Sequence, residues 1–220
     1  MSAVPQSRPQ GYWRVPELLS DLGPEVLAKL ESFYCELIRY NQKVNLIARK
    51  TELDADIAHF YDCIIGGKIV LDKSKAKEVY DVGSGNGLPG LVMAILDPNR
   101  QIVLVDPDTK KTDFLAFMGA QLGCKNVKVI RARLEEIPTG DITCGVSRGF
   151  AAITKVILLA RHPTRVGGEF FHFKGSGWVT EVAQIPSQIC TSWSPSLIKE
   201  YELPIISTRM AIICTKRIGS

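Results

Sequence analysis

The sequence has no paired-cysteine motif, no long apolar run and no strong excess of charge of either sign. None of its cysteines forms a Cys-x-x-Cys pair and most lie in apolar stretches, so reduced thiols are expected rather than a disulfide framework or a zinc site. No stretch approaches the length of a membrane span. The net charge of +4 permits a polyanionic partner without demanding one. The six cysteines are Cys35, Cys63, Cys124, Cys144, Cys190 and Cys214.

The first residues, "MSAVPQSRPQGYWRVPELL", lack the apolar core of a secretory signal. Residues 1–15 are therefore expected to form a short flexible tail. No acidic residue precedes Glu17, so an organellar presequence stays open as an alternative. With reduced thiols and no membrane span, the expected location is the cytoplasm.

Residues 16–77 have a helical period and no convincing strand, which predicts an N-terminal helical extension. The stretch "PEVLAKLESFYCELIRYNQKVNL" places its apolar residues on one stripe, as an amphipathic helix does. A second helix is expected in "LDADIAHFYDCIIGGKIV", ending near the pair Gly66-Gly67.

From Glu78 onward, short apolar runs of strand type alternate with helical runs. This alternation predicts an α/β domain over residues 78–220, with a parallel sheet covered on both faces. The last run, "RMAIICTK", is expected to be a final strand.

The stretch "DVGSGNGLPG" joins the first of these strands to a helix and has the pattern G-x-G-x-G. In an open α/β sheet, ligands bind beyond the carboxyl ends of the strands, where such a turn meets its helix. Asp81 precedes the glycines and would repel a pyrophosphate, but it suits a cationic group. Asp106 ends the next strand, where an acid that binds ribose belongs. The pattern favours S-adenosylmethionine, with a dinucleotide as the alternative.

Several motifs together resemble one family. They are "YNQKVNL", "HFYDCI", "DVGSGNGLPG", "LVDPDTKKTDFL", "RARLEE", "SRGF", "HFKG" and "STRMAIICTK", which span roughly residues 31–216. The chain resembles the bacterial guanine-N7 methyltransferases of 16S ribosomal RNA, also called glucose-inhibited division protein B. The resemblance implies a Rossmann-like class I methyltransferase fold, mostly parallel with an antiparallel strand at the C-terminus.

The resemblance also implies roles for individual residues. Arg148 is expected to be catalytic and to border the cofactor, and no metal is expected. Further contacts to S-adenosylmethionine are expected from Asp81, Gly83, Ser84, Gly85, Gly87, Leu88, Asp106, Leu134 and Glu135. Contacts to 16S ribosomal RNA, free or within the 30S particle, are expected from Asn45, Lys110, Arg133, Lys174 and Arg209. His59 and Asp62 also match family positions, with a capping or core role as the alternative for both and for Asn45.

This chain departs from the family at a few positions. Gly149 stands where the family usually has alanine after Ser-Arg, and Cys63-Ile64 follows Asp62 where Ser-Leu is usual. Thr208 stands where the family commonly has an acid before Arg209. These differences bear on substrate affinity more than on activity.

The absence of two catalytic motifs agrees with attack by guanine N7. The chain has no Asn-Pro-Pro-Tyr motif, which serves exocyclic amino groups, and no Pro-Cys motif, which serves cytosine C5. Cys144 is expected to be a buried apolar residue. Because N7 carries a free lone pair and no proton, catalysis then depends on proximity and electrostatics.

Other roles stay open for some of these residues and for the chain. The basic residues would otherwise form a solvated charged face. An aromatic side chain that stacks on the guanine is sought among Phe150, Phe171, Phe173 and Trp178, for most of which core packing is the alternative. The alternative functions are a methyltransferase acting on a small molecule or a protein, and a non-catalytic, cofactor-binding protein of ribosome assembly.

Overall fold

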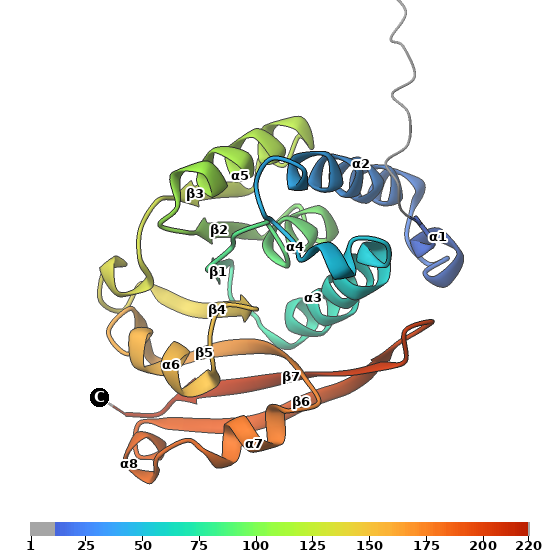
Figure 1. The fold of residues 1–220 in the computed structure, drawn as a ribbon. Helices are drawn as coiled ribbons and strands as arrows, with labels where there is room; N and C mark the ends of the chain where they lie inside the picture. The colour runs from blue at the N-terminus through green and yellow to red at the C-terminus, as the bar shows by residue number, and fades with distance from the viewer. Residues whose placement is uncertain (1–11, 220) are drawn as a thin grey trace, which may run out of the picture.

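A seven-stranded sheet in the order β3-β2-β1-β4-β5-β7-β6 forms the centre of the computed structural model, which describes residues 12–219. Strands β1 to β5 are parallel, and β7 pairs antiparallel with both β5 and β6. Figure 1 shows this order from β3 to β6 across the molecule. The predicted α/β class, the mostly parallel sheet and the antiparallel final strand are confirmed. The strands are β1 (Glu78–Val82), β2 (Gln101–Val105), β3 (Val127–Ile130), β4 (Ile142–Arg148), β5 (Thr164–Gly175), β6 (Trp193–Leu203) and β7 (Thr208–Arg217).

Helices cover both faces of the sheet (Figure 1). Most are short and lie between consecutive strands. The α-helices are α1 (Val15–Leu18), α2 (Pro24–Asn41), α3 (Asp62–Lys73), α4 (Gly90–Leu96), α5 (Thr109–Gln121), α6 (Ile153–Leu159), α7 (Trp178–Ala183) and α8 (Ser187–Cys190). Within residues 12–219 there are also two 3-10 helices, η1 (Arg49–Thr51) and η3 (Leu134–Glu136), and one π-helix, η2 (Asp56–Tyr61).

Two hydrophobic clusters lie on the two faces of the sheet, because successive strand residues point to opposite sides. In β2, Ile102 and Leu104 join the cluster that contains side chains of α2, α3, α4 and α5. Val103 and Val105 join the cluster that contains side chains of α6. The N-terminal helices therefore share one core with the sheet.

The prediction of a flexible tail over residues 1–15 is wrong for residues 13–15, which pack against the core. Residues 1–11 lie outside the described residues. The Trp13 ring lies 5.1 Å from the Tyr34 ring and 5.6 Å from the Phe60 ring. The Arg14 guanidinium forms an ion pair with Asp56 at 2.6 Å, and Val15 is fully buried. Apolar and ionic contacts with the π-helix thus hold this segment against the core.

The expected end of the second helix at Gly66-Gly67 is also wrong, because α3 continues through both glycines to Lys73. The pair serves close packing. A Cβ at Gly66 would lie 2.3 Å from Cε1 of Phe173 in β5, and a Cβ at Gly67 would lie 3.1 Å from Cγ of Met93 in α4. The absence of side chains here lets α3 approach the sheet.

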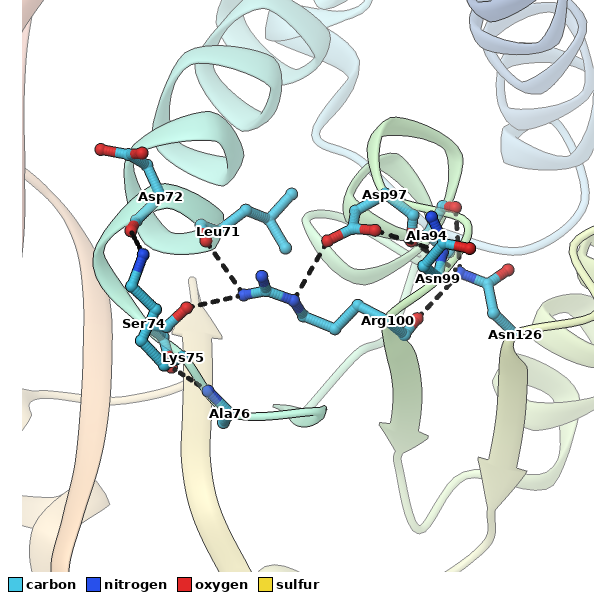
Figure 2. Close-up of polar contacts among 10 residues, drawn as sticks. All are labelled: Leu71, Asp72, Ser74, Lys75, Ala76, Ala94, Asp97, Asn99, Arg100 and Asn126. Atoms are coloured by element: carbon cyan, nitrogen blue, oxygen red, sulfur yellow. Dashed lines mark hydrogen bonds and ion pairs between the residues drawn. The ribbon is translucent and has the colours of Figure 1, made fainter.

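Polar side chains tie the ends of α3 and α4 together at the amino edge of the sheet, as Figure 2 shows. Arg100 Nη1 donates to the carbonyl oxygens of Leu71 and Ser74, at 3.0 Å each, and Nε lies 3.1 Å from Asp97. Asn126 Nδ2 lies within hydrogen-bonding distance of the carbonyl oxygens of Ala94, Asp97 and Arg100, at and after the end of α4. These bonds satisfy carbonyl groups that a helix end leaves without partners.

The two glycines of α3 give a matched test of this packing. Gly66→Ala should lower the free energy of unfolding by about 1–2 kcal/mol, because overpacking against a rigid ring outweighs the gain in helix propensity. Gly67→Ala should stay much closer to the wild type, because Met93 is flexible and can move. Urea unfolding measures both. Equal losses in the two variants would contradict this packing.

Candidate active site

The carboxyl ends of the parallel strands bring the predicted site residues to one edge of the sheet. Asp81 lies in β1, Asp106 follows β2 and Arg148 ends β4. Lys174 lies near the end of β5, and Arg209 lies at the start of β7, which runs back from the same edge because Gly175 pairs with Met210. The expected crowding of charged side chains along one rim is thus present.

Hydrogen bonds to the end of β2 hold the first part of the glycine turn. The N–H groups of Gly83 and Ser84 donate to the Val105 carbonyl at 2.9 and 3.1 Å. The Ser84 hydroxyl donates to the Asp81 carbonyl at 2.6 Å and accepts from the Val105 N–H at 2.9 Å. This arrangement argues against the expected contact of Ser84 with a cofactor, because its hydroxyl is already satisfied inside the turn.

The later residues of the turn differ in the space around them. Gly85 has a φ of +49°, and a Cβ there would be 3.6 Å from its nearest neighbour, the Gly83 carbonyl oxygen. At Gly87 a Cβ would lie 2.6 Å from Leu91 Cδ1, and the Leu88 side chain is buried in the core. Gly87 and Leu88 therefore serve the packing of α4, and Gly85 is the glycine of the turn with the most room around it.

Two carboxylates accept hydrogen bonds from the turn and from the start of the helix that follows it. Asp106 Oδ2 accepts from the Gly85 N–H at 3.0 Å. Asp81 is 1% exposed, and its Oδ2 accepts from the Gly90 N–H at 2.8 Å. Its Oδ1 is buried and has no hydrogen-bond partner within residues 12–219. Burial raises the pKa of Asp81 to about 7, and the nearby Asp106 adds to the rise.

A cavity of about 270 Å³ opens beside the turn, between the ends of β1, β2 and β3 and the start of α6. Three predicted cofactor residues, Gly83, Leu134 and Glu135, line it, as does the predicted RNA residue Arg133. Phe150 and Lys155 also line it and were not assigned to the cofactor from the sequence. Apolar walls with a few polar groups suit a nucleoside. Asp81 and Asp106 do not line this cavity, but they lie in and beside the turn that borders it. The Asp81 oxygen without a partner suits a cationic group, so the turn and the cavity together fit S-adenosylmethionine.

Arg148 points from the end of β4 toward the N-terminal helices. Its Nε donates to Asp62 Oδ2 at 2.7 Å, and its Nη2 donates to the Ala58 carbonyl at 2.8 Å and lies 2.9 Å from His59 Nδ1. Tyr201 of β6 donates its hydroxyl to the other Asp62 oxygen at 2.7 Å. Arg148 Nη1 makes no hydrogen bond within the described chain.

The hydrogen bonds of Thr51 fix the tautomer of His59. The Thr51 hydroxyl donates to the Ala48 carbonyl at 2.8 Å, so it accepts from His59 Nε2 at 2.9 Å. Nε2 therefore carries the ring proton, and Nδ1 accepts from Arg148. Burial, and secondly the charge of Arg148, lower the pKa of His59 to about 3, which keeps the ring neutral. We call Thr51, His59, Asp62, Arg148 and Tyr201 the Arg148 network.

The predicted RNA residues differ in how available they are. Asn45, Lys110, Arg133 and Arg209 are exposed. Lys174 is only 13% exposed, and its ammonium group lies 2.8 Å from Glu181 Oε2 and 2.8 Å from the Ala151 carbonyl oxygen. This geometry argues against a phosphate contact by Lys174, whose charge instead ties β5 to α7 and to the segment before α6.

A basic segment that leads into η1 was not predicted as part of this face. Lys43, Arg49 and Lys50 are exposed, and no acidic residue lies between Lys43 and Lys50. The Asn86 side chain donates to the Leu46 carbonyl at 3.1 Å, which holds this segment against the glycine turn. The charge run is visible in the sequence, but the contact that places it beside the turn is not.

The aromatic candidates separate by burial. Phe171 and Phe173 lie in the core, and Trp178 donates its ring N–H to Glu200 at 3.0 Å. Phe150 is 37% exposed and lines the cavity. A Cβ at Gly83 would lie 2.4 Å from its ring. Of the four candidates, Phe150 is therefore the one whose ring a nucleobase can reach.

No three or more His, Cys, Asp and Glu side chains within residues 12–219 lie close enough to hold a metal ion. Within the same range, no helix has both the length and the apolar character needed to cross a membrane.

Comparison with solved structures places the chain among methyltransferase folds. Geranyl diphosphate methyltransferase, in complex with GPP and sinefungin, superposes with a TM-score of 0.57 at 11% identity, over 89% of this chain and 100% of that chain. The 16S rRNA N2 G1207 methyltransferase of T. thermophilus, in complex with AdoMet and guanosine, gives a TM-score of 0.50 at 10% identity, over 71% of this chain and 39% of that chain. At such identities the likeness concerns the fold.

Sequence comparison identifies the family. The model of the family described as rRNA small subunit methyltransferase G matches residues 26–202. Ribosomal RNA small subunit methyltransferase G 3 of Bdellovibrio bacteriovorus is 38% identical over 215 residues, 97% of both chains. The ribosomal RNA small subunit methyltransferase G of Bordetella avium is 31% identical over 198 residues, 89% of this chain and 87% of that one. The chain therefore belongs to the rRNA small subunit methyltransferase G family.

Proposed function

We propose that this chain transfers the methyl group of S-adenosylmethionine to N7 of a guanine in 16S ribosomal RNA, with Arg148 as the residue that contacts the base. As a member of its family, the chain is an S-adenosylmethionine-dependent methyltransferase of small-subunit ribosomal RNA. The observation that supports this placement of the chemistry is the open glycine turn between Asp81 and Asp106, next to the strand end that carries Arg148.

The turn and the cavity would hold the cofactor together. Asp106 would accept hydrogen bonds from the ribose, and the unpartnered Oδ1 of Asp81 would face the cationic part of the ligand. The adenine of the cofactor would be enclosed by Leu134, Glu135 and Phe150. The bound cofactor supplies a methyl group on a cationic sulfur.

The protein's part in the reaction is positioning. Guanine N7 has a lone pair and no proton to lose, so no general base is required. Arg148 Nη1 donates a hydrogen bond to guanine O6, which is adjacent to N7, and so fixes the angle of attack. Transfer from a sulfonium to a neutral nitrogen needs no Lewis acid, so we propose a metal-free reaction.

RNA phosphates are contacted by three exposed basic residues, Lys110, Arg133 and Arg209. This basic surface extends past the glycine turn through Lys43, Asn45, Arg49 and Lys50. The proposed substrate is 16S ribosomal RNA, free or within the 30S particle, and the proposed location of the reaction is the cytoplasm.

Cofactor affinity should depend on pH through Asp81. Its pKa of about 7 means that the carboxyl group is protonated below neutrality, and a cationic ligand binds the ionised form better. Affinity should therefore rise by about tenfold per pH unit below pH 7 and level off above it. Calorimetry across pH should show this in the wild type and a flat profile in Asp81→Asn. The same slope in both proteins would contradict the role of Asp81.

The product should be 7-methylguanosine. Its fixed positive charge makes the strand break after borohydride and aniline treatment. At saturating cofactor, the rate should be nearly flat with pH through neutrality, because no proton leaves the nucleophile. The assay uses 30S particles and deproteinised RNA from cells that lack the gene. Methylated RNA that resists cleavage would contradict N7 as the target.

The exposed basic residues should contribute a salt-dependent part of RNA affinity. Lys110→Ala and Arg209→Ala should each flatten the plot of log affinity against log salt by about one phosphate contact. Lys125→Ala is the matched control, because Lys125 is exposed before β3, at the opposite edge of the sheet. Lys174→Ala should leave the slope unchanged, because its ammonium group is already paired. Unchanged slopes in the first two variants would remove them from the RNA face.

A further inference from the structure

We propose that His59 and Tyr201 are positioning residues for methyl transfer, acting through Arg148. Within residues 12–219 neither side chain hydrogen-bonds to the glycine turn, yet His59 binds the guanidinium and Tyr201 binds its partner Asp62. This inference rests on the proposed function, because it takes Arg148 as the residue that contacts the guanine.

Three hydrogen bonds hold the Arg148 guanidinium, and all of them are made by Nε and Nη2 rather than by Nη1. Arg148 Nε is bound to Asp62, and Nη2 is bound to the Ala58 carbonyl and to His59 Nδ1. Asp62 is fully buried, and the Arg148 side chain is 16% exposed. A planar guanidinium bound along two of its edges has a fixed orientation, so the direction of Nη1 is fixed as well.

Tyr201 fixes the carboxylate that Arg148 binds. It lies in β6, 139 residues along the chain from Asp62, and its hydroxyl donates to the Asp62 oxygen that Arg148 leaves free. Burial and the neighbouring Asp62 raise the pKa of Tyr201, so the hydroxyl stays protonated and remains a donor. With both oxygens bound, the Asp62 carboxylate cannot rotate away from Arg148.

The ring of His59 supplies Arg148 with a hydrogen-bond acceptor from the side of the π-helix. The π-helix Asp56–Tyr61 presents both the Ala58 carbonyl and the His59 ring to Arg148. Because Nε2 donates to Thr51 and the ring is neutral, Nδ1 is a permanent acceptor for the guanidinium. A protonated imidazole at this position would repel Arg148.

Variants of the two residues test the proposal in the full-length protein. His59→Asn keeps an oxygen near the position of Nδ1, whereas His59→Gln carries its amide toward Thr51 and removes that acceptor. Tyr201→Phe removes only the hydroxyl. Tyr34→Phe is the control, because the Tyr34 hydroxyl is buried without a hydrogen-bond partner in the described chain.

Tyr201→Phe and His59→Gln should each lower kcat about tenfold, the effect of one charge-assisted hydrogen bond, and change KM for RNA and for the cofactor less than about twofold. His59→Asn should recover most of the lost kcat, and Tyr34→Phe should match the wild type. Without any ligand, the Arg148 Nε–H signal in nitrogen-15 NMR should exchange faster in Tyr201→Phe and His59→Gln than in the wild type.

The outcomes separate this inference from the proposed function. If Arg148→Ala is inactive while Tyr201→Phe and His59→Gln keep wild-type kcat, the inference is overturned and the role of Arg148 stands. If His59→Asn is no better than His59→Gln, the acceptor at Nδ1 is not what positions Arg148, which also overturns the inference. Wild-type turnover by Arg148→Ala would overturn both.

Discussion

The buried ion pair of Arg148 and Asp62 joins the reactive edge of the sheet to the N-terminal helices, and the geometry of the site depends on it. A buried pair contributes little net stability compared with apolar packing, but losing one partner leaves an uncompensated charge and is costly. Here the pair is completed by the hydroxyl of Tyr201, the ring of His59 and a helix carbonyl. In the proposed reaction its value lies in orientation, because the bonds of Nε and Nη2 fix the direction of the guanidinium.

The glycine turn meets a second constraint, since it must serve the fold and leave room for a ligand. Gly83 and Gly87 make room for neighbouring side chains, and Gly90 leaves space for the Asp81 carboxylate, from which a Cβ would lie 2.6 Å. Among these glycines of the turn, Gly85 has the most room, because the nearest atom to a Cβ there would lie at 3.6 Å. Asp81 has the same double role, because one oxygen binds the first turn of α4 and the other has no partner within the described chain. In the proposed function, the fold and the cofactor chemistry thus depend on the same few residues.

Patterns local in the chain predicted the sheet, its parallel direction and the edge where charged residues gather, because alternation of strands and helices determines them. Features that depend on contacts between distant segments could not be predicted. Residue 66 is a glycine inside a helix because the Phe173 ring packs against it. Lys174 is unavailable to a phosphate because it pairs with Glu181, on a helix whose position the sequence does not reveal. Tyr201 was not identified as a site residue, because only pairing of β6 with β7 brings it to Asp62.

The central claim is that Arg148 is held on one side by the protein and contacts the target base on the other. The most direct measurement is a crystal structure with S-adenosylhomocysteine and an RNA oligonucleotide that contains the target guanine. The account predicts Nη1 within hydrogen-bonding distance of guanine O6, with N7 facing the cofactor sulfur, while Nε and Nη2 keep Asp62 and His59. A guanine bound away from Arg148, or a guanidinium that leaves Asp62 to reach the cofactor, would contradict it.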